Sequence, residues 1–307
     1  MYKKSSLKKT ILFGCSGFFG PAILEKYPNI TAVGRSAPPK YIKNKFIKIN
    51  DIRNLSKLDQ FKFDRVIFLI GNSDHHILNN NNLNLALSYN FSPLIAAIDY
   101  FIKRKIKKLV IFSGALIYGT KNLRLPVSEK QEIDGLQNNY LFSKFLSEQV
   151  ANFYRKKIDI INIRLSNIYG PTLHYRPDLV QSLLHKILIN KIRKKVISVK
   201  NMSPARDFIY SEDAADAVVK LIFSNYSGNI NLGTGKISKV KEVCKFISEN
   251  TGYKIIDKKQ KVSGQMNFVY NTSKLKKIIK WKPKYNLEKG IKKTIEKILI
   301  YKNELKK

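Results

Sequence analysis

A glycine loop between an apolar strand and a helix constrains the fold of this chain more than any other feature. Residues 11–13 predict a buried strand, and Gly14, Gly17 and Gly20 follow it directly. A helix is expected from Pro21, because proline suits a first helical turn. Such a loop lets backbone approach a diphosphate at the helix N-terminus, so its position predicts a dinucleotide site, although the glycines are three residues apart rather than in the tighter Gly-x-Gly-x-x-Gly pattern.

The first half of the chain alternates strands and helices. Further strands are expected at residues 30–33, 46–49, 65–70, 108–112 and 158–163, and helices at residues 83–104 and 139–154, with an asparagine-rich solvated loop at 79–82. The strand at 65–70 is apolar enough to be buried on both faces. This order predicts an α/β fold with a Rossmann-type doubly wound parallel sheet.

Composition indicates a globular protein. The chain has 307 residues, of which 44% are hydrophobic, and no apolar run approaches the roughly 18 residues of a membrane span. Two cysteines, Cys15 and Cys244, suggest a reduced, cytoplasmic protein without a disulfide framework. The net charge of +35 favours a solvated basic surface, with attraction of an anionic substrate or a membrane surface as alternatives, and we expect no specific nucleic-acid partner.

Residues after the second and third strands bear on the choice of cofactor. An acidic residue after the second strand would hold the ribose of NAD, whereas an arginine accommodates the phosphate of NADP. The chain has Arg35 there and no acid, which favours NADP over NAD. Asp51 and Ile52 follow the third strand, where an adenine amine could be met.

Tyr140 and Lys144 form the candidate catalytic pair. Four residues apart on a helix, they share one face, and an ammonium there favours the phenolate. The same spacing recurs at Tyr41/Lys45, Tyr270/Lys274 and Tyr285/Lys289. Only the helix at 139–154 follows a strand that ends in Ser113, in the crevice at the carboxyl ends of the strands, and this context selects Tyr140.

Ordered motifs along the whole chain carry a family resemblance. They are the glycine loop, Tyr140-x-x-Ser143-Lys144-x-x-x-Glu148, the segments 164–171, 206–213 and 231–235, and Trp281-Lys-Pro283 with 287–290. The chain resembles an extended short-chain dehydrogenase/reductase of the NAD-dependent epimerase/dehydratase family, which modifies nucleotide-linked sugars.

The resemblance implies a role for each matched residue. Tyr140 would be the acid/base, Lys144 would lower its pKa and bind the nicotinamide ribose, and Ser113 would supply a hydroxyl. Ala115, Asn167 and Arg206 would contact the substrate, the last two at its diphosphate. The implied cofactor contacts are Gly14, Ser16, Gly17, Phe18, Phe19, Gly20, Arg35, Asp51, Ile52, Leu69, Ile70, Gly71, Asn90, Tyr140 and Lys144. Helices 83–104 and 139–154 would form a homodimer interface.

The chain also departs from the family pattern. Gly114 stands where the family usually has Ser or Thr, and Ser113 is the nearest replacement. Ala115-Leu116 stands where dehydratases carry an Asp-Glu pair, so we do not expect dehydration to be the reaction. The adjacent His75 and His76 do not predict a metal site, because neighbouring side chains rarely face one ion; we expect them in a loop near the cofactor.

These observations predict residues 1–165 as an NAD(P)-binding domain, with a returning segment near 206–233, and residues 166–307 as a smaller α/β substrate region. The predicted activity is epimerisation of a nucleotide sugar at C4, in which the sugar is oxidised, rotates and takes the hydride back on its other face. One alternative is an NADPH-dependent nucleotide 4-keto-(6-deoxy)sugar reductase. Another is a non-catalytic Rossmann protein that senses nucleotides or associates with RNA, which the intact Tyr140 and Lys144 argue against.

Overall fold

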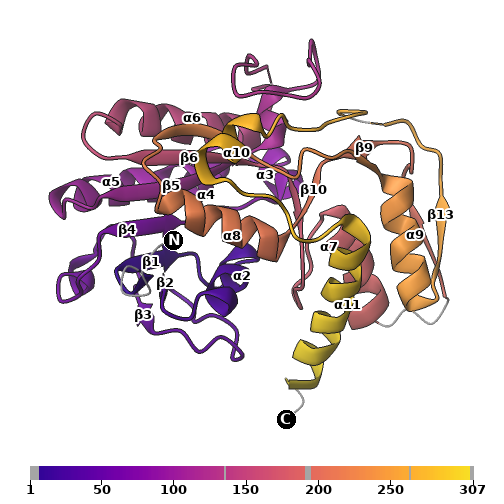
Figure 1. The fold of residues 1–307 in the computed structure, drawn as a ribbon, viewed down its shortest axis with the longest axis horizontal. Helices are drawn as coiled ribbons and strands as arrows, with labels where there is room; N and C mark the ends of the chain where they lie inside the picture. Colours follow the sequence, from indigo (N-terminus) through magenta and orange to yellow (C-terminus); the bar gives the residue numbers. More distant parts are fainter. Residues whose placement is uncertain (1–6, 135, 191–194, 263, 305–307) are drawn as a thin grey trace.

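A seven-stranded parallel sheet forms the centre of the molecule (Figure 1). The structure, a computed structural model, describes residues 7–134, 136–190, 195–262 and 264–304. The strand order is β11-β6-β5-β4-β1-β2-β3, which is the predicted doubly wound Rossmann arrangement, so the predicted fold class is confirmed. Its strands are β1 (Thr10–Phe13), β2 (Thr31–Gly34), β3 (Phe46–Lys48), β4 (Arg65–Phe68), β5 (Lys108–Gly114), β6 (Ile160–Leu165) and β11 (Gly228–Leu232).

Helices cover both faces of this sheet because its strands are apolar on both sides. Residues alternate along β1 and β4: Leu12 and Ile67 pack in one core cluster, whereas Phe13 and Phe68 pack in another. In Figure 1, α2 and α8 lie on one side of the sheet and α4, α5 and α6 lie on the other. These helices are α2 (Phe19–Lys26), α4 (Leu83–Asn90), α5 (Ser92–Lys103), α6 (Asn139–Tyr154) and α8 (Ser211–Ile222).

The second half of the chain builds a smaller region beside the carboxyl ends of the strands. It contains three two-stranded sheets and its own apolar cluster around Tyr169 and Val243. Its elements are β7 (Asn167–Tyr169), α7 (Leu179–Leu184), which continues as a π-helical turn (His185–Ile189), β8 (Val196–Val199), β9 (Ala205–Arg206), β10 (Phe208–Tyr210), β12 (Ser238–Lys239), α9 (Val240–Thr251), β13 (Lys254–Asp257) and α11 (Leu287–Glu304). Helix α10 (Ser273–Ile279) returns to the main sheet and packs on α8 and β11.

Two local predictions need correction. The helix expected over residues 83–104 is broken at Phe91 into α4 and α5, since Pro93 lies in the first turn of α5 and cannot continue a helix from the preceding turn. The histidines expected in a loop begin a short helix, α3 (His75–Asn79), whose N-cap Asp74 accepts hydrogen bonds from the backbone of His76 and Ile77.

The α4–α5 stretch also bears on the expectation that no segment spans a membrane. By length and composition alone, Leu83–Lys103 is apolar enough to do so, with a mean hydropathy of 1.3. A core helix of a folded domain meets the same criterion, and Leu94, Ala97, Ile98 and Phe101 of this stretch pack into the core against the sheet. Both cysteines are free and buried.

Candidate active site

A cavity of about 730 Å³ lies at the carboxyl ends of β1, β2 and β4. The predicted cofactor residues that line it are Gly14, Ser16, Gly17, Arg35, Asp51, Ile52, Leu69, Ile70 and Gly71. Sequence reasoning missed other lining residues, among them Ser36, Asn50, Arg53, Asn72, Ser88 and Tyr89. Predicted contacts Asn90 and Lys144 line a small second cavity beside the first, also bordered by Leu69 and Ile70.

The glycine loop shapes one wall of the large cavity. Gly14 has a φ of +82°, and a Cβ there would lie 2.9 Å from the carbonyl carbon of Leu69. A Cβ on Gly20 would lie 2.6 Å from the Gly14 oxygen, so the loop packs closely on itself. Phe18 is the N-cap of α2, and no side chain among the described residues caps this helix. Its first backbone N–H groups can therefore receive an anion.

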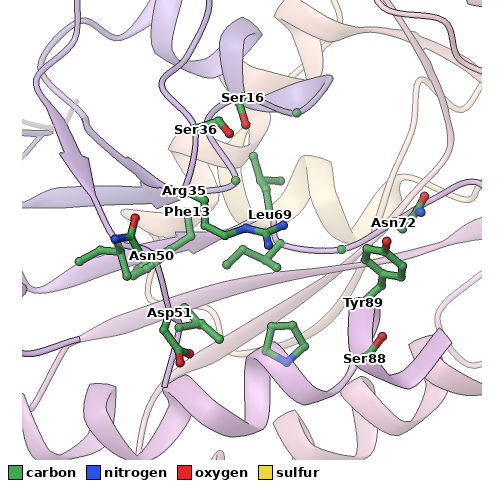
Figure 2. Close-up of a pocket in the computed structure, with 18 of the residues that line it drawn as sticks. Phe13, Ser16, Arg35, Ser36, Asn50, Asp51, Leu69, Asn72, Ser88 and Tyr89 are labelled. Carbon is green, nitrogen blue, oxygen red and sulfur yellow. The ribbon is translucent and has the colours of Figure 1, made fainter. Parts of the chain in front are cut away.

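Arg35 lines the cavity from the end of β2, and its side chain is exposed. In Figure 2 its side chain reaches into the middle of the cavity, with Ser16 and Ser36 to one side and Asp51 to the other. Asp51 is bound by Arg53, whose Nη2 lies 2.6 Å from Asp51 Oδ2, and this contact lowers the pKa of Asp51 to about 2. An anionic carboxylate and two guanidinium groups thus meet at this end.

Tyr140 and Lys144 lie in the first turns of α6. The N-cap Asn138 accepts a hydrogen bond from Leu141 N at 3.0 Å, and Tyr140 N donates to Asn79 Oδ1 at 3.1 Å. Asn139 Nδ2 donates to the carbonyl of Asn81 at 2.7 Å. The asparagine run predicted to be a solvated loop therefore holds the N-terminus of the helix that carries Tyr140.

Lys144 is directed at the edge of the cavity. Its Nζ lies 6.0 Å from the centre of the Tyr140 ring, and a Cβ on Gly71 would lie only 3.1 Å from it. Asn90 joins this group, because its Oδ1 accepts from Asn72 N at 2.8 Å. Residues from the loop after β4, from α4 and from α6 thus converge at the cavity wall around Gly71, and the Tyr140 ring lies just beyond Lys144.

Burial controls the protonation of both groups. It raises the pKa of Tyr140 to about 12, with the charge of Asp178 adding to the shift and that of Arg176 opposing it. Burial also lowers the pKa of Lys144 to about 8. The net shift of Tyr140 is opposite to the direction that the family resemblance implies, so its phenol is protonated at neutral pH.

Gly114, and not Ser113, faces the phenol. A Cβ on Gly114 would lie 3.9 Å from Tyr140 Oη, at ordinary contact distance. Neighbouring residues of a strand point to opposite faces, and Ser113 Oγ is buried without a hydrogen-bond partner among the described residues. The role of Ser113 as the catalytic hydroxyl stays a prediction.

The predicted substrate residues come from the smaller region and its border. Ala115 begins a buried 3₁₀ turn after β5. Asn167, exposed on β7, donates from its backbone N to the carbonyl of Asp207 at 3.1 Å, which brings it next to Arg206. The Arg206 guanidinium donates to the carbonyls of Gln265 and Met266, and burial lowers its pKa.

Arg176 and Asp178 are the residues near Tyr140 that sequence reasoning missed. They precede α7 and form an ion pair of 3.1 Å, and both charges act on the pKa of Tyr140. His75, whose ring centre lies 6.4 Å from that of Tyr140, is a third neighbour. In the sequence, the one indication that Arg176 and Asp178 could lie near the site was their position a few residues after the family motif that ends at Pro171.

The other Tyr/Lys pairs have structural surroundings. Tyr41 stacks on Tyr301 at 3.9 Å, Tyr270 is buried, and Tyr285 Oη donates to Glu212 at 3.3 Å. Across the described part of the chain, no three His, Cys, Asp or Glu side chains gather as metal ligands would.

Comparison with known proteins agrees with this fold. A putative UDP-glucose 4-epimerase of Methanocaldococcus jannaschii is 30% identical over 66% of this chain and 66% of its own length. A probable GDP-L-fucose synthase of Oryza sativa is 26% identical over 61% of this chain and 60% of its own. The chain thus aligns with slightly under two thirds of these curated relatives.

Solved structures match over nearly the whole chain. The UDP-glucose 4-epimerase of Thermotoga maritima, solved with UDP-glucose, superposes with a TM-score of 0.83 at 19% identity, covering 97% of this chain and 99% of that one. The Thermus thermophilus UDP-glucose 4-epimerase, in complex with NAD, gives 0.80 at 20% identity, covering 94% and 98%. At these identities the likeness establishes the fold alone. A family model also matches residues 10–233, and the chain therefore belongs to the NAD dependent epimerase/dehydratase family.

Proposed function

We propose that this protein is an NAD(P)-dependent epimerase that inverts C4 of a nucleotide-linked sugar. The observation that carries the proposal is the position of Lys144, a turn after Tyr140 on α6, against Gly71 in the wall of a cavity of about 730 Å³ that the glycine loop also lines. The resemblance to a putative UDP-glucose 4-epimerase supports a nucleotide-diphosphate sugar as substrate.

The cavity suits a nicotinamide dinucleotide. The close-packed glycines leave the N-terminus of α2 open for its diphosphate, and Arg35, Ser36 and Asp51 surround the adenosine end. Lys144 and Asn90 would lie toward the nicotinamide ribose. When bound, the dinucleotide supplies a hydride acceptor and donor. Residues 1–165, with β11 returning to their sheet, would hold the cofactor, and residues 166–307 would mainly hold the sugar nucleotide.

Tyr140 would move the proton in this reaction. Once its own proton has passed to solvent, the Tyr140 phenolate accepts the proton of the sugar 4-hydroxyl during oxidation and returns it when the ketone is reduced. Lys144 would stabilise the phenolate that forms. A part for Ser113 in proton transfer would require its hydroxyl to reach the phenol from the other face of β5. Asn167 and Arg206 would hold the diphosphate of the substrate, whose charge suits a guanidinium.

A second candidate, reduction of a nucleotide 4-keto-sugar by NADPH, has its own support. Arg35 favours a cofactor with a ribose phosphate, and the raised pKa of Tyr140 keeps the phenol in the form that donates a proton to a ketone. A relative described as a probable GDP-L-fucose synthase is consistent with this reaction. The chain would then exchange its cofactor at each turnover.

The nucleotide bound to the purified protein distinguishes the two candidates. Mass spectrometry of the released nucleotide should find retained NAD(P) for an epimerase, which then interconverts UDP-glucose and UDP-galactose or a related pair without added cofactor. A reductase should be isolated empty and should consume NADPH with a 4-keto-sugar.

Tyr140→Phe should lower turnover at least a hundredfold in either case, because general acid–base catalysis contributes that much. Tyr285→Phe is the matched control, since Tyr285 shares the Tyr-x-x-x-Lys spacing but lies against Glu212. Turnover of Tyr140→Phe within a few-fold of the parent would refute the assignment.

We also propose a homodimer formed through α4, α5 and α6. All three helices present apolar side chains to solvent, with Tyr89 42%, Ile95 41% and Phe153 72% exposed. Large exposed apolar side chains on adjacent helices suit an interface between copies.

A further inference from the structure

Arg176 lies on the substrate side of the chain but contacts the cofactor side. Its guanidinium carbon is 4.8 Å from the centre of the Phe18 ring, in the glycine loop, and its Nη2 donates to Ser73 Oγ. Phe18 is the N-cap of α2, where the diphosphate of a dinucleotide is expected. Ser73 follows Gly71 and Asn72, which line the cavity.

The loops around this point, residues 14–20 and 69–76, contain no lysine or arginine, although the chain has 57 in all. Their basic side chains are His75 and His76, and burial lowers the pKa of His75. Asp74 even adds a negative charge. Arg35 and Arg53 lie at the adenosine end of the cavity. A permanently charged side chain beside a diphosphate at the start of α2 therefore has to come from another part of the chain.

Arg176 has donors left for such an anion. Its described hydrogen bonds use Nε, to Asp178 Oδ2, and Nη2, to Ser73 Oγ, whereas no described hydrogen bond uses Nη1. The ion pair is partly solvated, with the side chain of Asp178 43% exposed and that of Arg176 23% exposed. Asp178 thus orients the guanidinium without enclosing it, and a planar fork suits a phosphate.

We propose that Arg176 binds the diphosphate of the dinucleotide. The segment before α7 would then contact the bound cofactor directly. The proposal rests on the proposed function only in that the cavity takes a dinucleotide. Arg176 would then link the two halves of the chain. It would bind the cofactor on one side, while its charge and that of its partner Asp178 act on the pKa of Tyr140 on the other.

Binding of cofactor fragments to the full-length protein tests this proposal. ADP-ribose 2′-phosphate contains the diphosphate and adenosine 2′-monophosphate lacks it; ADP-ribose and adenosine form the equivalent pair if the site prefers NAD. By calorimetry, Arg176→Gln should weaken binding of the diphosphate fragment roughly ten- to hundredfold and leave the other fragment within about twofold. Arg104→Gln is the matched control, since Arg104 also lies over an aromatic ring (Phe63) and pairs with an aspartate (Asp59), but it lies before the amino ends of β4 and β5, whereas the cavity lies at the carboxyl ends of the strands.

The outcomes distinguish a failure of the proposed role of Arg176 from a failure of the proposed dinucleotide site. Equal losses for both fragments, or no loss, would overturn the role of Arg176 while leaving the cofactor site in place. A wild-type protein that binds neither fragment pair would instead overturn the dinucleotide site itself. If Arg176→Gln does not fold, arginine modification of the wild type by phenylglyoxal replaces it: the diphosphate fragment should protect Arg176, and unchanged modification would contradict the proposal.

Discussion

Tyr140 is surrounded by groups from distant parts of the chain. Asn79 holds its backbone, Gly114 faces its hydroxyl, and Lys144 lies a turn away on α6. Asp178 adds a negative charge from the smaller region. Because the phenol starts protonated, its ability to act as a base depends on what binds beside it, whereas its ability to act as an acid is already present.

The predicted role of the Ser113 hydroxyl can be tested by moving a hydroxyl from position 113 to position 114. If Ser113 supplies it, Ser113→Ala should lower kcat/KM roughly a hundredfold, the usual effect of losing one such donor. Gly114→Ser in the same background should restore part of the loss, since a Cβ at position 114 lies 3.9 Å from Tyr140 Oη. Gly114→Ala is the control that adds the Cβ without the hydroxyl. Unchanged activity of Ser113→Ala would remove Ser113 from the mechanism.

The lowered pKa of Lys144 predicts a pH profile. Its ammonium is charged below a pKa of about 8 and neutral above it, so kcat/KM should fall about tenfold per unit as pH rises beyond about 8. The stability contribution of Lys144 has the opposite sign. Between about 8 and the ordinary value of 10.5 the unfolded state binds more protons, so this contribution rises with pH. A kcat/KM profile flat to pH 10, measured with parallel unfolding curves, would contradict the assignment.

Helical spacing and position after a strand were sufficient to select Tyr140 and Lys144 from the sequence. Gly114 was recognised as a departure, but only folding shows that it faces the phenol. Arg176 and Asp178 could not be found, because their approach to Phe18 and Tyr140 depends on tertiary packing between residues far apart in the chain. Local patterns carry no information on such contacts.

At the scale of elements, a buried ion pair fixes α6 to the sheet. Arg164 on β6 donates to both carboxylate oxygens of Glu148 on α6, at 3.1 and 2.7 Å, and to Tyr118 Oη at 2.8 Å. Tyr118 Oη in turn donates to Asn231 on β11 at 2.7 Å. The helix that carries Tyr140 is therefore held in register with two neighbouring strands.

Removing one charge of this pair should be costly. Glu148→Gln leaves the Arg164 guanidinium buried without its counter-charge, and breaking such a pair costs about 3–5 kcal/mol of unfolding free energy. Urea unfolding measures this loss. The control is Glu249→Gln, which breaks an exposed pair with Lys245 and should cost less than about 1 kcal/mol. A loss for Glu148→Gln as small as that of the control would refute the role of the pair.

The first six strands of the main sheet were the most predictable elements, since most of them are short apolar runs buried on both faces. Neither β11, whose sequence alternates with asparagine, nor the short strands of the smaller region were predicted. The break in the helix expected over residues 83–104 could also have been predicted from Pro93. The asparagine run was not, because its contacts with α6 link residues about sixty positions apart. Polar side chains look alike in sequence whether they bind water or another backbone.

At the scale of the whole molecule, the proposed dimer gives a simple test. Phe153→Asp places a charge in the apolar face of α6, and it should convert the protein from dimer to monomer in light scattering after size-exclusion chromatography. Leu299→Asp on α11, which is also exposed, should leave the mass unchanged. A wild-type protein that is already monomeric would exclude the interface.

The position of β11 has a consequence for how the protein is made. Among the described strands, β11 pairs with β6 alone, at the edge of the sheet, and it follows the smaller region's first elements in the chain. In a nascent chain, the backbone N–H and C=O groups of β6 on this side therefore stay unpaired until Leu232 has left the ribosome. Unpaired strand edges promote aggregation. Chains truncated just before Gly228 should need chaperones to stay in solution, while chains that extend beyond Leu232 should need them less.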